Sequence, residues 1–441
     1  MDPTTPSCPA PAAPCRRHRD DEAAARLVRA TRDAFSLLLA GLLAYAQMQA
    51  GEDAPRDAPS RPRPQSEAGT AARDDGLAAA IEAGRAAMRD RIARTATPGM
   101  AVAVASGGVL VWEEGFGVVD LETRASVTPA TRFGLGSVSK SLTMALAGRL
   151  VDRGLLDLDA PIEKYLPDFP HAGKGISTRL IAGHLSGLDD TYAAAHWTGG
   201  DHFATTRDAL AVIYKEPLRS EPGREHFYAT GTYTLIAGVI EKASGLTFLE
   251  AMRRHVLEPL GLYTIVPNDP RAPAAGAATF YVSDDAGKPS RAPYYDPSHK
   301  RAGAGFLSTP GDLARFGAAM ARPGFLTEKT LAEIFKPLKT GSGADTGVGL
   351  GWRIGREGWP GMGWTVGPDD QARRIVHQPG GGPGISCWLV LDLNSGVVVA
   401  ILSNMTGAPV GGRHLDAILE AFAKAAAGGA AGRTGPARPP R

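Results

Sequence analysis

Two pairs of apolar segments, one near each end of the chain, constrain the fold more than any other feature. In the first pair, Met100–Ala105 and Val109–Gly117 flank a Ser-Gly-Gly turn; in the second, Cys387–Leu393 and Val397–Leu402 flank Asn-Ser-Gly. Short apolar runs around such glycine-containing turns predict β-hairpins. The simplest arrangement places both hairpins in one antiparallel sheet, which the two ends of the chain would share.

Helical patterns accompany both hairpins. Apolar residues at helical spacing, from Leu77 to Ile92, precede the first hairpin, and a helix is expected over 412–427 after the second. The long stretch from about 137 to 345 between the hairpins is mostly helical and loop-like. We therefore expect an α+β fold: an antiparallel sheet with flanking helices, plus a mostly helical subdomain inserted between the two halves of the sheet.

The segments outside this domain have compositions of their own. Arginines precede an apolar run over 34–46, which is shorter than the ~20 residues of a membrane span and fits a signal h-region ending in Ala-Tyr-Ala. Residues 1–50 are therefore expected to be a signal peptide or a membrane anchor, although an amphipathic helix is the alternative. Composition predicts a flexible linker over 51–75 and a disordered tail over 428–441. The globular domain then covers 76–427, and the protein is expected to be exported, periplasmic or secreted, or membrane-anchored.

Charge and cysteine content exclude several functions. The 441 residues carry a formal net charge of +2, and the basic residues are scattered, so no nucleic-acid partner is expected. The three cysteines, Cys8, Cys15 and Cys387, form neither a CxxC motif nor a Cys/His metal spacing. We expect no metal and no cofactor.

Candidate chemistry begins where the insertion begins, with Ser137-Val138-Ser139-Lys140 at the start of a helix. Residues three apart share a helix face, so the Lys140 amine can reach the Ser137 hydroxyl. A serine needs a base to become a nucleophile, and a helix start offers N–H groups to a developing oxyanion. Alone, the motif is weak, because a capping serine beside a solvated lysine would look the same.

Two further elements follow along the chain. Tyr228-Ala229-Thr230 lies in a loop before a helix, where a phenol beside an ammonium group would ionise more easily and suit a general base. His377-Gln378-Pro379-Gly380-Gly381 precedes the last hairpin, where glycines let a substrate approach and a free N–H could complete an oxyanion hole. A packed tyrosine and a flexible glycine turn are the ordinary alternatives.

In this order, the three elements resemble those of the β-lactamase and penicillin-binding protein superfamily, in its class C and esterase branch. Over roughly 77–425 the chain is similar to the mitochondrial serine β-lactamase-like members. Further similar stretches are His184-Leu185-Ser186-Gly187, Tyr294-Tyr295-Asp296-Pro297-Ser298, Gly305-Phe306-Leu307-Ser308-Thr309 and Gly311-Asp312-Leu313. The resemblance implies a β-lactamase/transpeptidase-like fold. It also implies that Ser137 is the nucleophile, that Lys140 and Tyr228 activate it, and that His377 lies near the substrate carboxylate or carbonyl.

The sequence departs from the superfamily pattern at two places. Thr230 stands where most relatives carry asparagine, and a hydroxyl offers fewer donors than an amide, so binding of a β-lactam side chain is in doubt. Gln378-Pro379 separates His377 from the glycines, which suggests one extra residue in a loop. Either alignment assigns the oxyanion N–H to Gly380 or Gly381, and with Thr230 and His377 these form the expected substrate-binding set.

We expect the protein to be a serine hydrolase that acts through an acyl-enzyme on Ser137. A peptidase or amide hydrolase is the preferred interpretation. A carboxylic-ester hydrolase or a weak β-lactamase is the alternative, and a non-catalytic penicillin-fold binding or scaffold protein is the alternative of another class. The Gly-x-Ser-x-Gly motif of α/β-hydrolases and the HExxH motif of metallo-hydrolases are both missing from the sequence. The expected partner is a small-molecule or peptide substrate, and residues 34–46 could also associate with a membrane. The sequence does not determine the oligomeric state.

Overall fold

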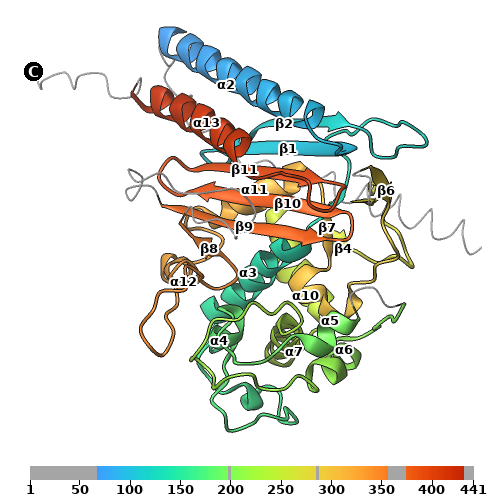
Figure 1. Ribbon diagram of the computed structural model, residues 1–441. Coiled ribbons are helices and arrows are strands. Elements are labelled where there is room, and N and C mark those ends of the chain that lie inside the picture. Colours follow the sequence, from blue (N-terminus) through green and yellow to red (C-terminus); the bar gives the residue numbers. More distant parts are fainter. Residues whose placement is uncertain (1–66, 197–199, 285–287, 356–373, 432–441) are drawn as a thin grey trace, which may run out of the picture. The chain divides into compact units, whose positions relative to one another are not determined.

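The strands of the main sheet come from both ends of the chain (Figure 1). The computed structural model describes residues 67–196, 200–284, 288–355 and 374–431. The expected signal or anchor segment, including 34–46, lies outside these ranges. Within them, no helix combines the length and the apolar character that crossing a membrane requires.

The main sheet has six strands in the order β2-β1-β11-β10-β9-β8, and all neighbouring strands are antiparallel. Within this sheet β1 pairs with β11, from Met100 opposite Ser403 to Ser106 opposite Val397. Both predicted hairpins therefore share one antiparallel sheet, as expected. The strands are β1 (Gly99–Ser106), β2 (Val109–Gly117), β8 (Arg353–Ile354), β9 (Ile375–Gly382), β10 (Ile385–Asp392) and β11 (Val397–Ser403).

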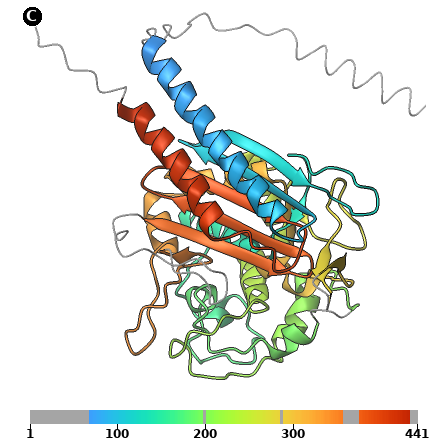
Figure 2. The same cartoon turned by 45° about the horizontal axis from the view of Figure 1, so that its top comes forward.

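Helices cover both faces of this sheet. The helices α2 (Glu67–Ala93) and α13 (Arg413–Ala431) lie side by side over the outer face, and α11 (Pro310–Met320) packs on the inner face (Figures 1 and 2). Because both faces are buried, the central strands are continuous apolar runs. A side chain at Gly84 of α2 would come within 2.6 Å of the Trp112 ring, which explains a glycine on the apolar face of that helix.

The outer helices are longer than the sequence predicts. The helix α2 begins at Glu67, inside the expected linker of 51–75, because its first turns are rich in alanine, the best helix former. At the other end, α13 continues to Ala431, past the expected start of the tail at 428, again through alanines.

The region between the hairpins combines helices and loops, as predicted. Two small sheets accompany it, one in the order β3-β7-β4 and one formed by β5 and β6. Its helices are α3 (Ser139–Asp152), α4 (Thr178–Ala182), α5 (Thr191–Ala195), α6 (Thr206–Ile213), α7 (Tyr233–Ser244), α8 (Phe248–Met252), α9 (Glu258–Leu260), α10 (Arg301–Ala304) and α12 (Glu328–Ile334). Its strands are β3 (Phe133–Gly134), β4 (Val266–Pro267), β5 (Tyr281–Ser283), β6 (Pro289–Arg291) and β7 (Phe306–Ser308). Tighter or wider helical turns are η1 (Gly136–Val138), η2 (Ile162–Lys164), η3 (Arg253–Leu257) and η4 (Ser298–Lys300).

Candidate active site

Ser137 lies in the short 3₁₀ turn η1, which leads directly into α3. The preceding Gly136 has a left-handed backbone (φ 46°), and a side chain there would meet the Gly381 oxygen at 2.6 Å. Only glycine allows this close approach, which brings strand β9 against the Ser137 turn. Ser137 itself is partly exposed and can meet a substrate, whereas its neighbour Val138 is fully buried.

Lys140, one turn further along, is fully buried and donates to three oxygen atoms. Its Nζ lies 3.1 Å from Ser137 Oγ, 3.2 Å from Thr230 Oγ1 and 3.0 Å from the Gly303 carbonyl oxygen. A buried amine needs such partners, because an unsatisfied donor is costly. The predicted Ser137–Lys140 contact is therefore present.

Thr230 reaches this lysine because a carboxylate fixes its loop. Asp190 accepts hydrogen bonds from the Thr230 N–H (2.9 Å) and the Gly231 N–H (2.8 Å). Burial raises the pKa of Asp190, although these two bonds and the charge of Lys140 oppose the shift. Thr230 thus contributes a hydroxyl oxygen to Lys140.

Tyr228 meets the same pair from the neighbouring loop. Burial alone would raise its pKa, but the charge of Lys140, hydrogen bonds with Lys140 and Ser137, and the charge of Arg353 together lower the pKa below that of a free phenol. The Lys140 Nζ lies 4.8 Å from the Tyr228 ring centre, and the Arg353 guanidinium carbon lies 5.8 Å from it. The phenol is therefore surrounded by positive charge, which favours its ionised form.

His184 packs against the Tyr228 ring at a centroid distance of 4.2 Å. Its Nδ1 accepts a hydrogen bond from the Ala229 N–H, so this nitrogen carries no proton. Burial and the charge of Lys140 hold the pKa of His184 well below its usual range. His184 also has a left-handed backbone (φ 60°), a conformation that non-glycine residues seldom adopt and that rigid surroundings must maintain.

The expected role of His377 is wrong. In an antiparallel pair, residues opposite each other point to the same face. Gln378 stands opposite Leu389 and belongs to the inner face, whereas His377 is fully buried and stacks on Trp388, part of the outer-face core, at 5.0 Å. The glycine-rich segment is strand β9, and no extra loop residue separates the motif.

This register also distinguishes the two glycines that the sequence left open. A side chain at Gly380 would meet the Leu135 oxygen at 2.1 Å, and Gly380 is buried. Gly381 is exposed and lies against Gly136, the residue before Ser137. Gly381 is thus the strand residue whose backbone is open beside the candidate nucleophile.

A second buried lysine lies near the first. Lys300 is 1% exposed, and burial, with the charge of Lys140, lowers its pKa to about 6 against the opposing effect of Asp190. Its Nζ lies 5.4 Å from the Tyr295 ring centre. No sequence argument pointed to Lys300, because a lysine is normally expected at the surface.

Sequence reasoning also missed Asp190, His184 and Arg353 as parts of this site. The His184-Leu185-Ser186-Gly187 stretch had been noted only for its resemblance, and nothing local assigns a role to the other two. Among the described residues, no group of three or more histidine, cysteine, aspartate or glutamate side chains could hold a metal ion.

The fold and the site together define a class of protein. An antiparallel sheet flanked by helices, a serine at the start of the helix it precedes, a lysine one turn on and a tyrosine from a neighbouring loop are the arrangement of penicillin-recognising serine enzymes. A family model described as "Beta-lactamase" matches residues 84–423. The chain belongs to this beta-lactamase family.

Two curated relatives and one solved structure show how far the similarity extends. The serine beta-lactamase-like protein LACTB, mitochondrial, of Homo sapiens is 27% identical, over 78% of this chain and 80% of that protein. Penicillin-binding protein 4* of Bacillus subtilis is 26% identical, over 69% of this chain and 67% of that protein. D-amino acid amidase from Ochrobactrum anthropi SV3, 21% identical, shares the fold with a TM-score of 0.65 over 78% of this chain and 99% of that one.

Proposed function

We propose that this protein is a serine hydrolase that forms an acyl-enzyme on Ser137. The observation that carries the proposal is the contact of 3.1 Å between the buried Lys140 Nζ and the partly exposed Ser137 Oγ. A structural lysine would not need a solvent-accessible serine as its partner, whereas a nucleophile must be both activated and accessible.

The proton of Ser137 goes to Tyr228 in this proposal. As an ammonium group, Lys140 donates to the oxygens of Ser137, Thr230 and Gly303 and also hydrogen-bonds with Tyr228, so its N–H donors are shared among these oxygens. The Ser137 oxygen then accepts from Lys140 and keeps its own proton free to donate. Tyr228, whose lowered pKa favours the phenolate, is the acceptor and therefore the general base.

The remaining steps follow from the surrounding backbone. As Ser137 Oγ bonds to the substrate carbonyl carbon, negative charge develops on the carbonyl oxygen, and the N–H groups of Ser137 and Gly381 stabilise it. Tyr228 returns the proton to the leaving group, which departs and leaves the acyl ester. Water, deprotonated by Tyr228, then hydrolyses that ester and restores the Ser137 hydroxyl.

Amides and peptides are the substrates we propose first. The amidase with the same fold acts on amino acid amides by its name. Arg353 adds a largely buried positive charge beside Tyr228, which favours a substrate that carries a carboxylate.

Covalent labelling tests the proposal directly. The protein is incubated with a fluorophosphonate and with a fluorescent penicillin, and intact mass spectrometry measures the adduct. We expect one adduct on the wild type and none on Ser137→Ala. Equal labelling of Ser137→Ala would refute the assignment of the nucleophile, and an unlabelled wild type would favour a binding or scaffold role.

Turnover then ranks the substrate classes. Amino acid amides and short peptides of both configurations, p-nitrophenyl esters and nitrocefin are compared by kcat/KM, with Ser137→Ala as the blank. The proposal predicts the highest value for an amide or peptide, and a clear preference for esters or nitrocefin would overturn that choice.

A further inference from the structure

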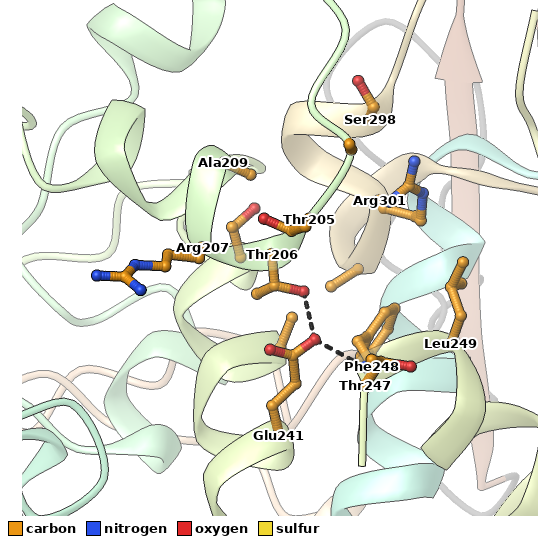
Figure 3. Close-up of a pocket in the computed structure, with 14 residues that line it drawn as sticks. Thr205, Thr206, Arg207, Ala209, Glu241, Thr247, Phe248, Leu249, Ser298 and Arg301 are labelled. Carbon is orange, nitrogen blue, oxygen red and sulfur yellow. Dashed lines mark hydrogen bonds between the residues drawn. The ribbon is translucent and has the colours of Figure 1, made fainter. Parts of the chain in front are cut away.

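A cavity of about 250 Å³ lies apart from the Ser137 site, between the starts of α6, α8 and α10 and one side of α7 (Figure 3). Its lining includes Thr206, Glu241, Phe248 and Arg301 but not Ser137, Lys140 or Tyr228. The volume is below the range of about 300–1,000 Å³ typical of drug-sized ligands, so its ligand is small.

Arg301 brings a positive charge to this cavity. Its Nε is buried and meets no hydrogen-bond acceptor among the described residues. The charges of Asp269 and Asp296 act on it, but neither carboxylate bonds to it, and burial lowers its pKa. A buried guanidinium donor without an acceptor is costly, and a carboxylate is the partner that its geometry suits.

Glu241 brings a negative charge. Its Oε1 accepts from Thr206 Oγ1 (2.6 Å) and from the Phe248 N–H (2.8 Å), so the side chain is held in place. Its Oε2 takes part in no hydrogen bond among the described residues and remains able to accept one from a ligand. Figure 3 shows Glu241 and Arg301 on different sides of the cavity, with Phe248 between them.

Between these charges the wall is apolar. Ala209, Ala237 and the Phe248 ring line it, and all three are buried. We propose that this cavity binds a free amino acid with an apolar side chain, with its carboxylate on Arg301, its ammonium group beside Glu241 and its side chain against Phe248. This assignment of a ligand is independent of the chemistry proposed for Ser137.

The wall of the cavity is also connected to the candidate active site. Arg301 and Ala302 begin the four-residue helix α10. The Ala302 carbonyl oxygen accepts from Thr143 Oγ1 of α3 at 2.7 Å, and the next carbonyl, that of Gly303, accepts from Lys140 Nζ at 3.0 Å. A ligand that pulls on Arg301 therefore acts on the backbone that holds Lys140. This regulatory consequence rests on the proposed function: we expect the bound amino acid to change the acylation rate of Ser137.

Calorimetry on the Ser137→Ala protein tests the binding without turnover. The probes are L- and D-phenylalanine, 3-phenylpropionate, which lacks the amine, and 2-phenylethylamine, which lacks the carboxylate. At least one phenylalanine enantiomer should bind, and each analogue should bind at least about ten-fold more weakly. No binding at about 10 mM, or equal affinity for all probes, would overturn the proposal.

Paired variants locate the site. Arg301→Gln should weaken binding at least about ten-fold, whereas Arg254→Gln, which removes an exposed arginine outside the cavity lining, should change it less than about two-fold. If Arg301→Gln does not fold, Ala237→Leu is used in its place, because it fills the cavity and leaves both charges. Unchanged affinity in the variant that folds would refute the site.

Binding to the acylated wild-type protein shows whether the ligand occupies this cavity or the Ser137 site. Protein labelled with the fluorophosphonate should bind phenylalanine as the unlabelled protein does, and loss of binding on labelling would place the ligand at Ser137 instead. If binding is retained but the acylation rate does not respond to phenylalanine, the connection through α10 is wrong.

Discussion

Removing the charge of Lys140 should slow acylation by making Tyr228 harder to ionise. Lys140→Met keeps most of the buried volume and deletes the ammonium group. The lowered pKa of Tyr228 depends largely on this charge, because burial acts in the opposite direction. The active base is the phenolate, so acylation should rise with pH as the phenol ionises. In Lys140→Met that rise should move to higher pH.

The size of the effect follows from the distance. Two unit charges 4.8 Å apart, the separation of the Lys140 Nζ and the Tyr228 ring centre, interact by about 3.5 kcal/mol at an effective dielectric constant of about 20. This energy corresponds to roughly 300-fold in the population of the phenolate at a fixed pH below its ionisation. We therefore expect Lys140→Met to lose on the order of 10²–10³ in acylation rate near pH 7, within the range of general acid–base groups.

Stopped-flow acylation with an activated ester, measured from about pH 6 to pH 10, decides this. Tyr228→Phe should lose a similar factor and should lack the ionisation altogether. The double variant should be little slower than the slower single variant, because the two groups act as one unit. Circular dichroism checks that each variant folds. Fully additive losses, or a Lys140→Met profile with an unmoved pH dependence, would show that Tyr228 is not the base that Lys140 supports.

Three other predictions concern parts of the chain with different roles. Lys300→Met should raise the melting temperature at pH 7, because the mutation removes the cost of burying a charge. The folded-state pKa of Lys300 is about 6, below the ordinary 10.5, so the unfolded chain binds more protons between these values and wild-type stability increases with pH across that window. The gain in melting temperature from the mutation should therefore shrink towards pH 10. His377→Phe, which keeps a ring to stack on Trp388, should leave acylation within about two-fold of wild type, and a large loss would return His377 to the site. Fractionation of cells that make the full chain should find residues 34–46 removed or the protein in membranes, whereas soluble protein with an intact N-terminus would contradict export and anchoring.

Local patterns in the sequence predicted the elements whose cause is local. The hairpins follow from short apolar runs around glycine-containing turns, and the Ser137–Lys140 contact follows from helical spacing. The prediction that Tyr228 belongs to the site depended on its place in a loop before a helix and on the order of the three motifs along the chain. These features need no knowledge of distant partners, which is why a single sequence sufficed for them.

The features that the sequence did not predict depend on contacts between distant segments. Asp190 fixes the Thr230 loop across 40 residues of sequence, and Arg353 approaches Tyr228 from another element. Strand β9 is not predicted from the sequence, because Pro379 and its following glycines are poor strand formers, yet it pairs with β10 over its full length. Reading alternate residues along it would have placed His377 and Gln378 on opposite faces.

The pairing of β1 with β11 has a consequence for synthesis in the cell. These two paired strands lie about 300 residues apart in the chain, so β1 and β2 leave the ribosome long before β11 is synthesised. Until β11 emerges, the edge of β1 offers unpaired N–H and C=O groups on a strand that is apolar throughout, and such edges are prone to aggregate. Nascent chains of this protein should therefore depend on chaperones until translation is nearly complete, and a truncation that deletes β11 should be insoluble, whatever it does to catalysis.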